Sequence, residues 1–191
     1  MSCLAFRLNV EKPTHLNRAG EDQIEWMSIE QAEEACKKKP KKIFIDVYTD
    51  WCGWCKKMDK TTFADPTVVK YVKEEYYAVK MDAEDQNNII FKNKVFKFNP
   101  QQKANELAIL FLNGEMSYPT TVYLDEKLNV IKSMGGYLDA RQFNMILHYF
   151  GQNAYKKKKS LEDFKKDFKD EIWLKWQWVK EFWEIARFGS R

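Results

Sequence analysis

The chain has 191 residues, of which 45% are hydrophobic and 31% are charged, and its formal net charge is +4. This length and balance predict one soluble globular domain of ordinary size with additions, and the sequence has no apolar run of about 18 residues that could form a membrane-spanning helix. The excess of basic over acidic residues, 32 against 28, is too small to indicate a nucleic-acid-binding protein.

Four cysteines are present, which is too few for a scaffold held together by disulfides. Cys3 and Cys36 lie apart from each other and from the other two. We expect Cys36 to be a small buried hydrophobic residue and Cys3 to be an incidental thiol. The first ten residues lack the basic start and the long apolar stretch of a signal peptide. Either the protein is cytoplasmic or a leader is missing from this chain.

The beginning of the chain is predicted to lead into the domain. Residues 1–23 show no hydrophobic period and predict a loosely ordered lead-in. Residues 24–27 alternate and predict an edge strand. Ser28, followed three residues later by Gln31, is a capping box that opens a helix over 29–38.

The next stretch carries the chemistry. Residues 42–48 predict a buried strand, which delivers Cys52 and Cys55 to the first turn of a helix that runs to about Thr62. The unpaired N–H groups of a first helical turn favour a thiolate, so the pKa of a cysteine there falls from about 8.5 to roughly 3.5–7.5. Cys52 is expected to be the attacking sulfur, and Cys55, one turn later, to resolve the mixed disulfide.

A structural disulfide or half of a zinc site is the alternative for this Cys-x-x-Cys pair. Structural zinc needs about four ligands, usually two such pairs or added histidines. The chain has one pair and two histidines, His15 and His148, neither of which lies near a second pair. Redox chemistry is therefore favoured, with no metal.

The middle of the chain predicts a helix from Pro66, a strand over 76–81 and an insertion of about residues 83–115. Within the insertion, residues 89–98 predict a hairpin that turns near Asn93-Lys94, and residues 101–112 predict a helix. Two interpretations of the hairpin are open. It is either a lid on the edge of the sheet, which is slightly favoured because none of its residues is reactive, or a specificity element near the active site.

The last part of the domain predicts two antiparallel strands and a helix. The strands cover 120–125 and 130–134 and are joined at 126–129, and Asp139 caps a helix over 140–150. Together the elements predict an α/β sandwich with parallel central strands and an antiparallel last pair.

A basic, Trp-rich helical extension is predicted over 152–191. It starts with a lysine run at 156–159, and apolar residues then recur at helical spacing over 161–186. Burial against its own domain or a second copy of the chain is favoured. The alternative is a helix on a membrane surface, against which the acidic residues of this segment argue.

The residues around the two cysteines resemble those of the thioredoxin superfamily. The run Trp51-Cys52-Gly53-Trp54-Cys55-Lys56 matches its active-site motif, and Tyr118-Pro119-Thr120 matches the segment that carries its cis-proline. Asp46 matches the buried acid of the family, and Lys80 matches its lysine partner. More narrowly, the chain is similar to the thioredoxin-like domains of bacterial envelope thiol–disulfide interchange proteins. The resemblance implies a thioredoxin fold, a three-layer α/β/α sandwich with a mixed sheet, over 24–151.

The resemblance also implies roles for these residues. Asp46 would exchange a proton with Cys55, with a pKa that burial raises and Lys80 moderates. The alternative is a strand-end acid exposed to water.

Substrate binding is expected from the residues around the pair. Pro119 would be cis and would place Tyr118 beside Cys52, and the alternative is a trans proline that starts an edge strand. Gly53 would let the backbone turn tightly. Trp51 and Trp54 would offer an apolar rim to an extended client, or would simply pack.

The sequence therefore predicts a thiol–disulfide oxidoreductase that acts on protein disulfides through the Cys52–Cys55 dithiol without another cofactor. Its partners would be a disulfide-containing client and a dithiol that supplies or accepts electrons. An oxidase or isomerase is the nearest alternative. A redox-inactive binding module that uses the hairpin or the C-terminal helix is the alternative of another class. The resemblance implies the cell envelope, with the cytoplasm as the alternative.

Overall fold

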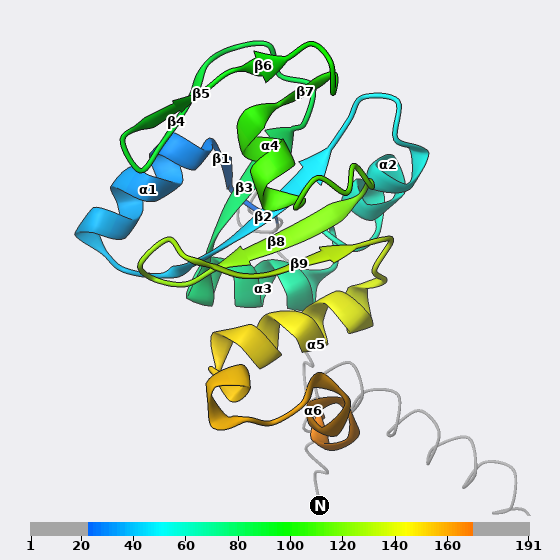
Figure 1. Cartoon of the computed structure of the whole chain (residues 1–191). Coiled ribbons are helices and arrows are strands. Elements are labelled where there is room, and N and C mark those ends of the chain that lie inside the picture. Colours follow the sequence, from blue (N-terminus) through cyan, green and yellow to red (C-terminus); the bar gives the residue numbers. More distant parts are fainter. Residues whose placement is uncertain (1–22, 170–191) are drawn as a thin grey trace, which may run out of the picture.

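A computed structural model describes residues 23–169 of the chain. Five strands form its central sheet in the order β1-β3-β2-β8-β9 (Figure 1). The strands are β1 (Trp26–Met27), β2 (Lys42–Tyr48), β3 (Tyr76–Asp82), β8 (Thr120–Leu124) and β9 (Val130–Gly135). Strand β3 is parallel to β1 and β2, whereas β8 is antiparallel to β2 and β9. This topology confirms the predicted fold class and the predicted antiparallel last pair.

Helices cover both faces of the sheet (Figure 1). Helices α1 (Ile29–Lys38) and α4 (Glu106–Phe111) lie on one face, and α3 (Pro66–Glu75) and α5 (Ala140–Gly151) lie on the other. Helix α2 (Gly53–Lys60) follows β2. Among the described residues, no helix is both long enough and apolar enough to span a bilayer.

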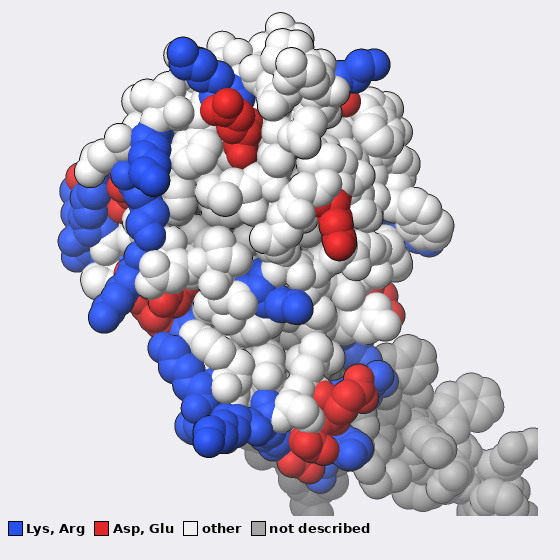
Figure 2. Space-filling model, viewed as in Figure 1, with Lys and Arg blue, Asp and Glu red and all other residues white. Residues whose placement is uncertain are grey.

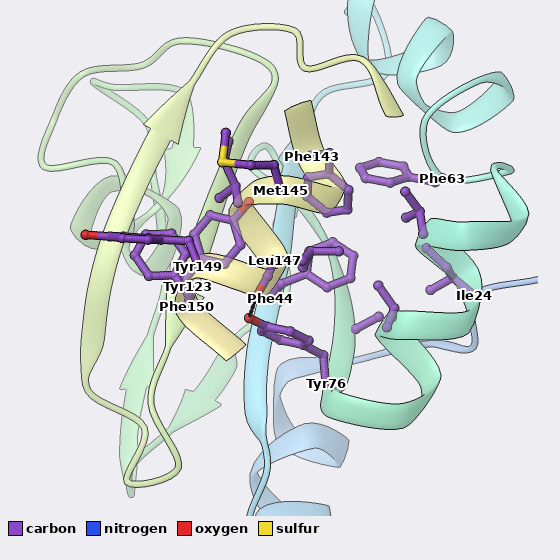
Figure 3. Packing of buried hydrophobic residues seen from close by; sticks show 14 of the residues in the cluster. Ile24, Phe44, Phe63, Tyr76, Tyr123, Phe143, Met145, Leu147, Tyr149 and Phe150 are labelled. Carbon is purple, nitrogen blue, oxygen red and sulfur yellow. Dashed lines mark hydrogen bonds between the residues drawn. The ribbon is translucent and has the colours of Figure 1, made fainter. Parts of the chain in front are cut away.

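Strand β2 is buried on both faces and therefore contributes side chains to two hydrophobic cores. Ile43, Ile45 and Val47 belong to the core under α1 and α4, whereas Phe44 belongs to the core under α3 and α5. In that second core Phe143 packs edge-on against Phe44, with ring centroids 5.3 Å apart (Figure 3). Because strand side chains alternate, Asp46 points to the same face as Phe44.

The insertion forms the predicted hairpin, with a small correction. Strands β4 (Ile89–Phe91) and β5 (Lys94–Phe96) pair antiparallel. The turn residues are Lys92 and Asn93, both with positive φ (51° and 60°), so the turn lies one residue earlier than predicted. This two-residue loop matches the twist of the flanking strands.

The helix predicted over 101–112 was placed too early. Helix α4 begins at Glu106, because the Asn105 side chain caps it by accepting the Leu107 N–H. Before it, β6 (Phe98–Asn99) pairs with β7 (Ala104–Asn105). The Asn99 side-chain oxygen accepts hydrogen bonds from the N–H groups of residues 101 and 102, which holds these residues in a turn rather than a helix.

The first part of the C-terminal extension packs on the domain. It contains the 3-10 helix η1 (Ala154–Lys157) and helix α6 (Leu161–Asp167). Phe164 is 8% exposed and joins the core under α5. The prediction of one continuous helix over 161–186 is wrong within the described residues, because α6 ends at Asp167. The next residue, Phe168, has an extended backbone, and its ring lies beside those of Phe164 and His148. Predictions for residues 1–22 and 170–191, including Cys3 and the tryptophans after 170, lie outside the described residues.

Candidate active site

Cys52 and Cys55 form a disulfide at the start of α2. The S–S distance is 2.07 Å and the Cα atoms are 5.3 Å apart. Cys52 is the N-cap of α2, and its sulfur accepts the Cys55 N–H at 3.1 Å. The same N–H and the positive end of the helix would stabilise a thiolate on Cys52 after reduction. This placement confirms the predicted strand, loop and helix around the pair.

Both sulfur-bearing residues lie below the surface. Cys52 is 5% exposed and Cys55 is 1% exposed, so Cys52 is the more accessible of the two by a small margin. The two tryptophans beside them are exposed, Trp51 by 66% and Trp54 by 56%. A client would therefore meet two indole rings before it meets the sulfur of Cys52.

Pro119 reaches the same end of the sheet through β8. The Tyr118–Pro119 peptide bond is cis, as the resemblance implies. The next residue, Thr120, lies opposite Val47 near the end of β2. The Tyr118 ring meets the Trp51 ring edge-on, with centroids 5.7 Å apart. The register of two neighbouring strands thus brings the proline loop to the cysteine loop.

Tyr137 belongs to this surface and was not found from the sequence. Its ring lies 5.2 Å from that of Trp54. The loop that carries it is tied to the proline loop, because the Gly136 N–H donates to the Pro119 carbonyl at 2.8 Å. Its only sequence signal was its place directly after the glycines that end β9.

The reason expected for Gly53 is wrong. A Cβ built on this glycine would meet nothing within 4 Å, and its φ is not in the left-handed region. The turn into α2 therefore does not require glycine.

Asp46 is completely buried, and Lys80 lies beside it. The two residues are register partners on β2 and β3, and Lys80 Nζ lies 2.6 Å from Asp46 Oδ2. Burial raises the pKa of Asp46 to about 6, while the Lys80 ammonium opposes that rise. The alternative of an exposed strand-end acid is wrong. Asp46 Oδ1 has no hydrogen-bond partner among the described residues, which leaves it free to accept a proton.

A second carboxylate, Asp59, completes an acid–lysine–acid group. It comes from α2, four residues after Cys55, and forms an ion pair with Lys80. Burial alone would lower the pKa of Lys80, but Asp46 and Asp59 outweigh it and raise that pKa. Asp59 was missed in the sequence, although its spacing from Cys55 places both on one face of a helix.

The other candidates have structural surroundings. Cys36 is buried and its thiol donates to the Lys41 carbonyl at 3.2 Å. His148 stacks on Tyr71 with ring centroids 3.6 Å apart. Within residues 23–169, no group of three or more His, Cys, Asp or Glu side chains could hold a metal ion.

Comparison with known proteins gives consistent results. A family model described as a thioredoxin-like domain matches residues 29–151. The thiol:disulfide interchange protein DsbD of Haemophilus influenzae is 28% identical over 128 residues, which cover 64% of this chain and 19% of that protein. DsbD of Photorhabdus laumondii is 29% identical over 126 residues, which cover 65% of this chain and 19% of that protein. The chain thus spans about a fifth of the length of these relatives.

Two solved structures share the fold. A DsbH oxidoreductase aligns with a TM-score of 0.52 and 17% identity, over 77% of this chain and 95% of that one. A thioredoxin-fold protein from Helicobacter pylori aligns with a TM-score of 0.53 and 21% identity, over 78% of this chain and 89% of that one.

Proposed function

The chain belongs to the thioredoxin-like domain family, and from this premise we propose that it is a thiol–disulfide oxidoreductase that reduces or exchanges disulfides in proteins. The observation that carries the proposal is the Cys52–Cys55 disulfide at the N-terminus of α2, whose Asp59 forms an ion pair with Lys80 of the buried Asp46–Lys80 pair. The relatives named thiol:disulfide interchange proteins support it.

The first step is attack by the reduced protein. The Cys52 thiolate attacks one sulfur of the client disulfide, whose S–S bond breaks as a new bond forms to Cys52 Sγ. The other client sulfur leaves as a thiolate and takes a proton from solvent. The Cys55 N–H and the N-terminus of α2 stabilise the negative charge of the Cys52 thiolate for this step.

The second step releases the client. Asp46 accepts the thiol proton of Cys55, directly or through one water, and the Cys55 thiolate attacks Cys52 Sγ. The Cys52–client bond breaks, the client sulfur leaves as a thiolate that takes a proton from solvent, and the Cys52–Cys55 disulfide of the structure forms. Two electrons have then passed from the dithiol to the client, and a partner dithiol restores the reduced state. Lys80 holds the Asp46 carboxylate in place at 2.6 Å.

Clients bind, in this proposal, across the surface that surrounds Cys52. Trp51, Trp54 and Tyr118 supply apolar contact, and the cis-Pro119 loop supplies backbone against which an extended client segment can lie. Because the chain resembles thiol–disulfide interchange proteins of the cell envelope, we also propose that it works in the cell envelope.

The test is dithiothreitol-driven reduction of insulin by the wild type, Cys52→Ser and Cys55→Ser. We expect turnover by the wild type only. When reduced Cys55→Ser is mixed with insulin after the dithiothreitol has been removed, a mixed disulfide should accumulate because no second thiol resolves it. An inactive wild type would overturn the proposal and favour a redox-inactive binding module. The reduction potential of the Cys52–Cys55 pair then separates a reductase from an oxidase or isomerase.

A further inference from the structure

The two tryptophans beside the disulfide hold side chains of opposite charge. The Trp51 indole N–H donates to Glu84 Oε1 at 3.0 Å. Lys57 Nζ lies 4.8 Å from the centroid of the Trp54 ring and 5.1 Å from that of Tyr137. The hydrogen bond holds one carboxylate in the loop after β3, and the cation–π contacts hold one ammonium against Tyr137 in the loop after β9. Strands β3 and β9 lie on opposite sides of β2, the strand that leads to Cys52.

Other acidic side chains reinforce the side of Trp51. They come from the loop before the first cysteine and from the loop after β3, and are Asp50, Asp82 and Asp85. The two loops are joined, because the Ala83 N–H donates to the Tyr48 carbonyl at 2.8 Å and the Glu84 N–H donates to Asp82 Oδ1 at 2.9 Å.

The electrostatics follow this geometry. Burial raises the pKa of Asp82, and Asp50, Glu84 and Asp85 add to the rise. Burial also raises the pKa of Tyr118 to about 12, with a further contribution from Glu84 and Asp82. The negative potential therefore reaches the ring beside the cis-proline.

The side of Trp54 is basic. Lys56 and Lys57 are consecutive, exposed residues in the first turn and a half of α2. Asp59, on the same helix, forms its ion pair with the inward-lying Lys80. The positive charge of Lys57 is thus presented to a client on the face of two aromatic rings.

We propose that the acidic side at Trp51 and Glu84 and the basic side at Trp54 and Lys57 select clients by charge. The protein would prefer a client cysteine that has a basic residue on its side toward Glu84 and an acidic residue on its side toward Lys57. This inference rests on the proposed function and names the substrate class of that site. Complementary charges steer and orient a client more than they tighten its binding. The preference is therefore one of orientation along the client chain.

The test compares two isomeric peptides, each presented as its disulfide-linked homodimer. One has two lysines before its cysteine and two glutamates after it, and the other has the reverse order. Their composition and net charge are identical. We expect the reduced wild type to react about fivefold faster with one isomer at low ionic strength, and the difference to fall below about twofold in 0.5 M salt, because exposed charges are weak and screened.

Charge reversal identifies the groups responsible. The double variant Glu84→Lys, Lys57→Glu should prefer the other isomer, and the ratio between isomers is the readout, so a general loss of rate does not affect it. The matched control is Glu162→Lys, Lys94→Glu, which reverses two exposed charges on α6 and β5 and should keep the wild-type ratio. Equal rates with both isomers, or an unchanged ratio in the Glu84/Lys57 variant, would overturn the inference and leave the proposed function intact. Failure to reduce either isomer would overturn the proposed function.

Discussion

At the scale of single residues, Asp46 determines how the site responds to pH. It is 0% exposed, and its folded pKa of about 6 lies above the ordinary value of 3.8. A carboxyl whose pKa is raised by folding stabilises the folded protein while it is protonated. That contribution is fully present below about pH 4 and is lost as the pH rises through about 6.

We predict that Asp46→Asn makes the oxidised protein more stable at neutral pH. A difference of about two pKa units corresponds to about 3 kcal/mol. The free energy of urea-induced unfolding should be similar for the two proteins at pH 4 and higher for the variant at pH 7.5. A variant with the same dependence on pH as the wild type would contradict this account of Asp46.

The two neighbours of Asp46 should shift its titration in opposite directions. Lys80→Met removes a positive charge, so the pKa of Asp46 should rise. Asp59→Asn removes a negative charge that raises the pKa of Asp46, so that pKa should fall. The pH dependence of the release of client from the Cys52 mixed disulfide measures both shifts, and Glu162→Gln, an exposed acid on α6, is the control. Shifts in the same direction would contradict the proposed arrangement.

Sequence reasoning found the residues whose signal is local. Cys52 and Cys55 follow from their spacing, and Asp46 was found through the resemblance to the thioredoxin superfamily. It missed Asp59, Glu84 and Tyr137, which reach the site through contacts with Lys80, Trp51 and Trp54. Each of these contacts joins two segments that lie far apart in the sequence, so the segment that carries the residue does not reveal its partner.

At the scale of elements, the β4–β5 hairpin acts as a cover for α1. The N–H groups of Ile90 and Lys92 donate to the carboxylates of Glu30 and Glu33 on α1, at 3.0 and 2.9 Å. Phe91 lies in the core below, with its ring 5.6 Å from that of Phe111. These contacts support the interpretation of the hairpin as a lid on the sheet edge.

We predict that Phe91→Ala lowers the free energy of unfolding by about 3 kcal/mol, because a buried aromatic ring leaves a cavity. Val95 on β5 is 52% exposed, and Val95→Ala should change stability by less than about 0.5 kcal/mol. Urea denaturation measures both. If Phe91→Ala instead left stability unchanged and slowed insulin reduction in the fully folded protein, the hairpin would be a specificity element.

The starts of helices were predictable where the sequence has a clear N-cap residue. The capping boxes at Ser28 and Asp139 and the Asp65 cap before Pro66 all start helices where expected. The start of α4 was missed because several polar residues precede it and more than one could cap the helix. In the structure, the Asn99 side chain holds the preceding turn and the Asn105 side chain caps the helix.

At the scale of the whole molecule, the lysine cluster over η1 and the disulfide lie at opposite ends of the sheet. Lys and Arg gather at the lower left of Figure 2, over η1 and the loop after it, where Lys156, Lys157 and Lys158 are exposed. Lys156 acts electrostatically on Asp125 and Glu126, which follow β8, and the end of β8 lies opposite the start of β2. The disulfide follows the other end of β2. This lysine cluster is therefore not what stabilises a Cys52 thiolate.

The described part of the extension after α5, residues 152–169, packs on the domain. The Tyr149 hydroxyl donates to the Lys159 carbonyl at 2.8 Å, and its ring lies 5.4 Å from that of Phe164. We predict that Phe164→Ala lowers the free energy of unfolding by about 2–4 kcal/mol without changing the reduction potential of the Cys52–Cys55 pair. Glu162→Ala, an exposed neighbour on α6, is the control. Unchanged stability in urea would show that α6 contributes nothing to the core.

The burial of Cys52 has a consequence for which client disulfides can reach it. Cys52 is 5% exposed, whereas its sequence neighbours Trp51 and Trp54 are largely exposed, so this surface suits a narrow, flexible stretch of polypeptide. Cystines locked inside a finished globule cannot bend far enough to enter, whereas those on nascent, damaged or tail segments can. For the proposed function, this position favours client disulfides that lie in unfolded or extended segments.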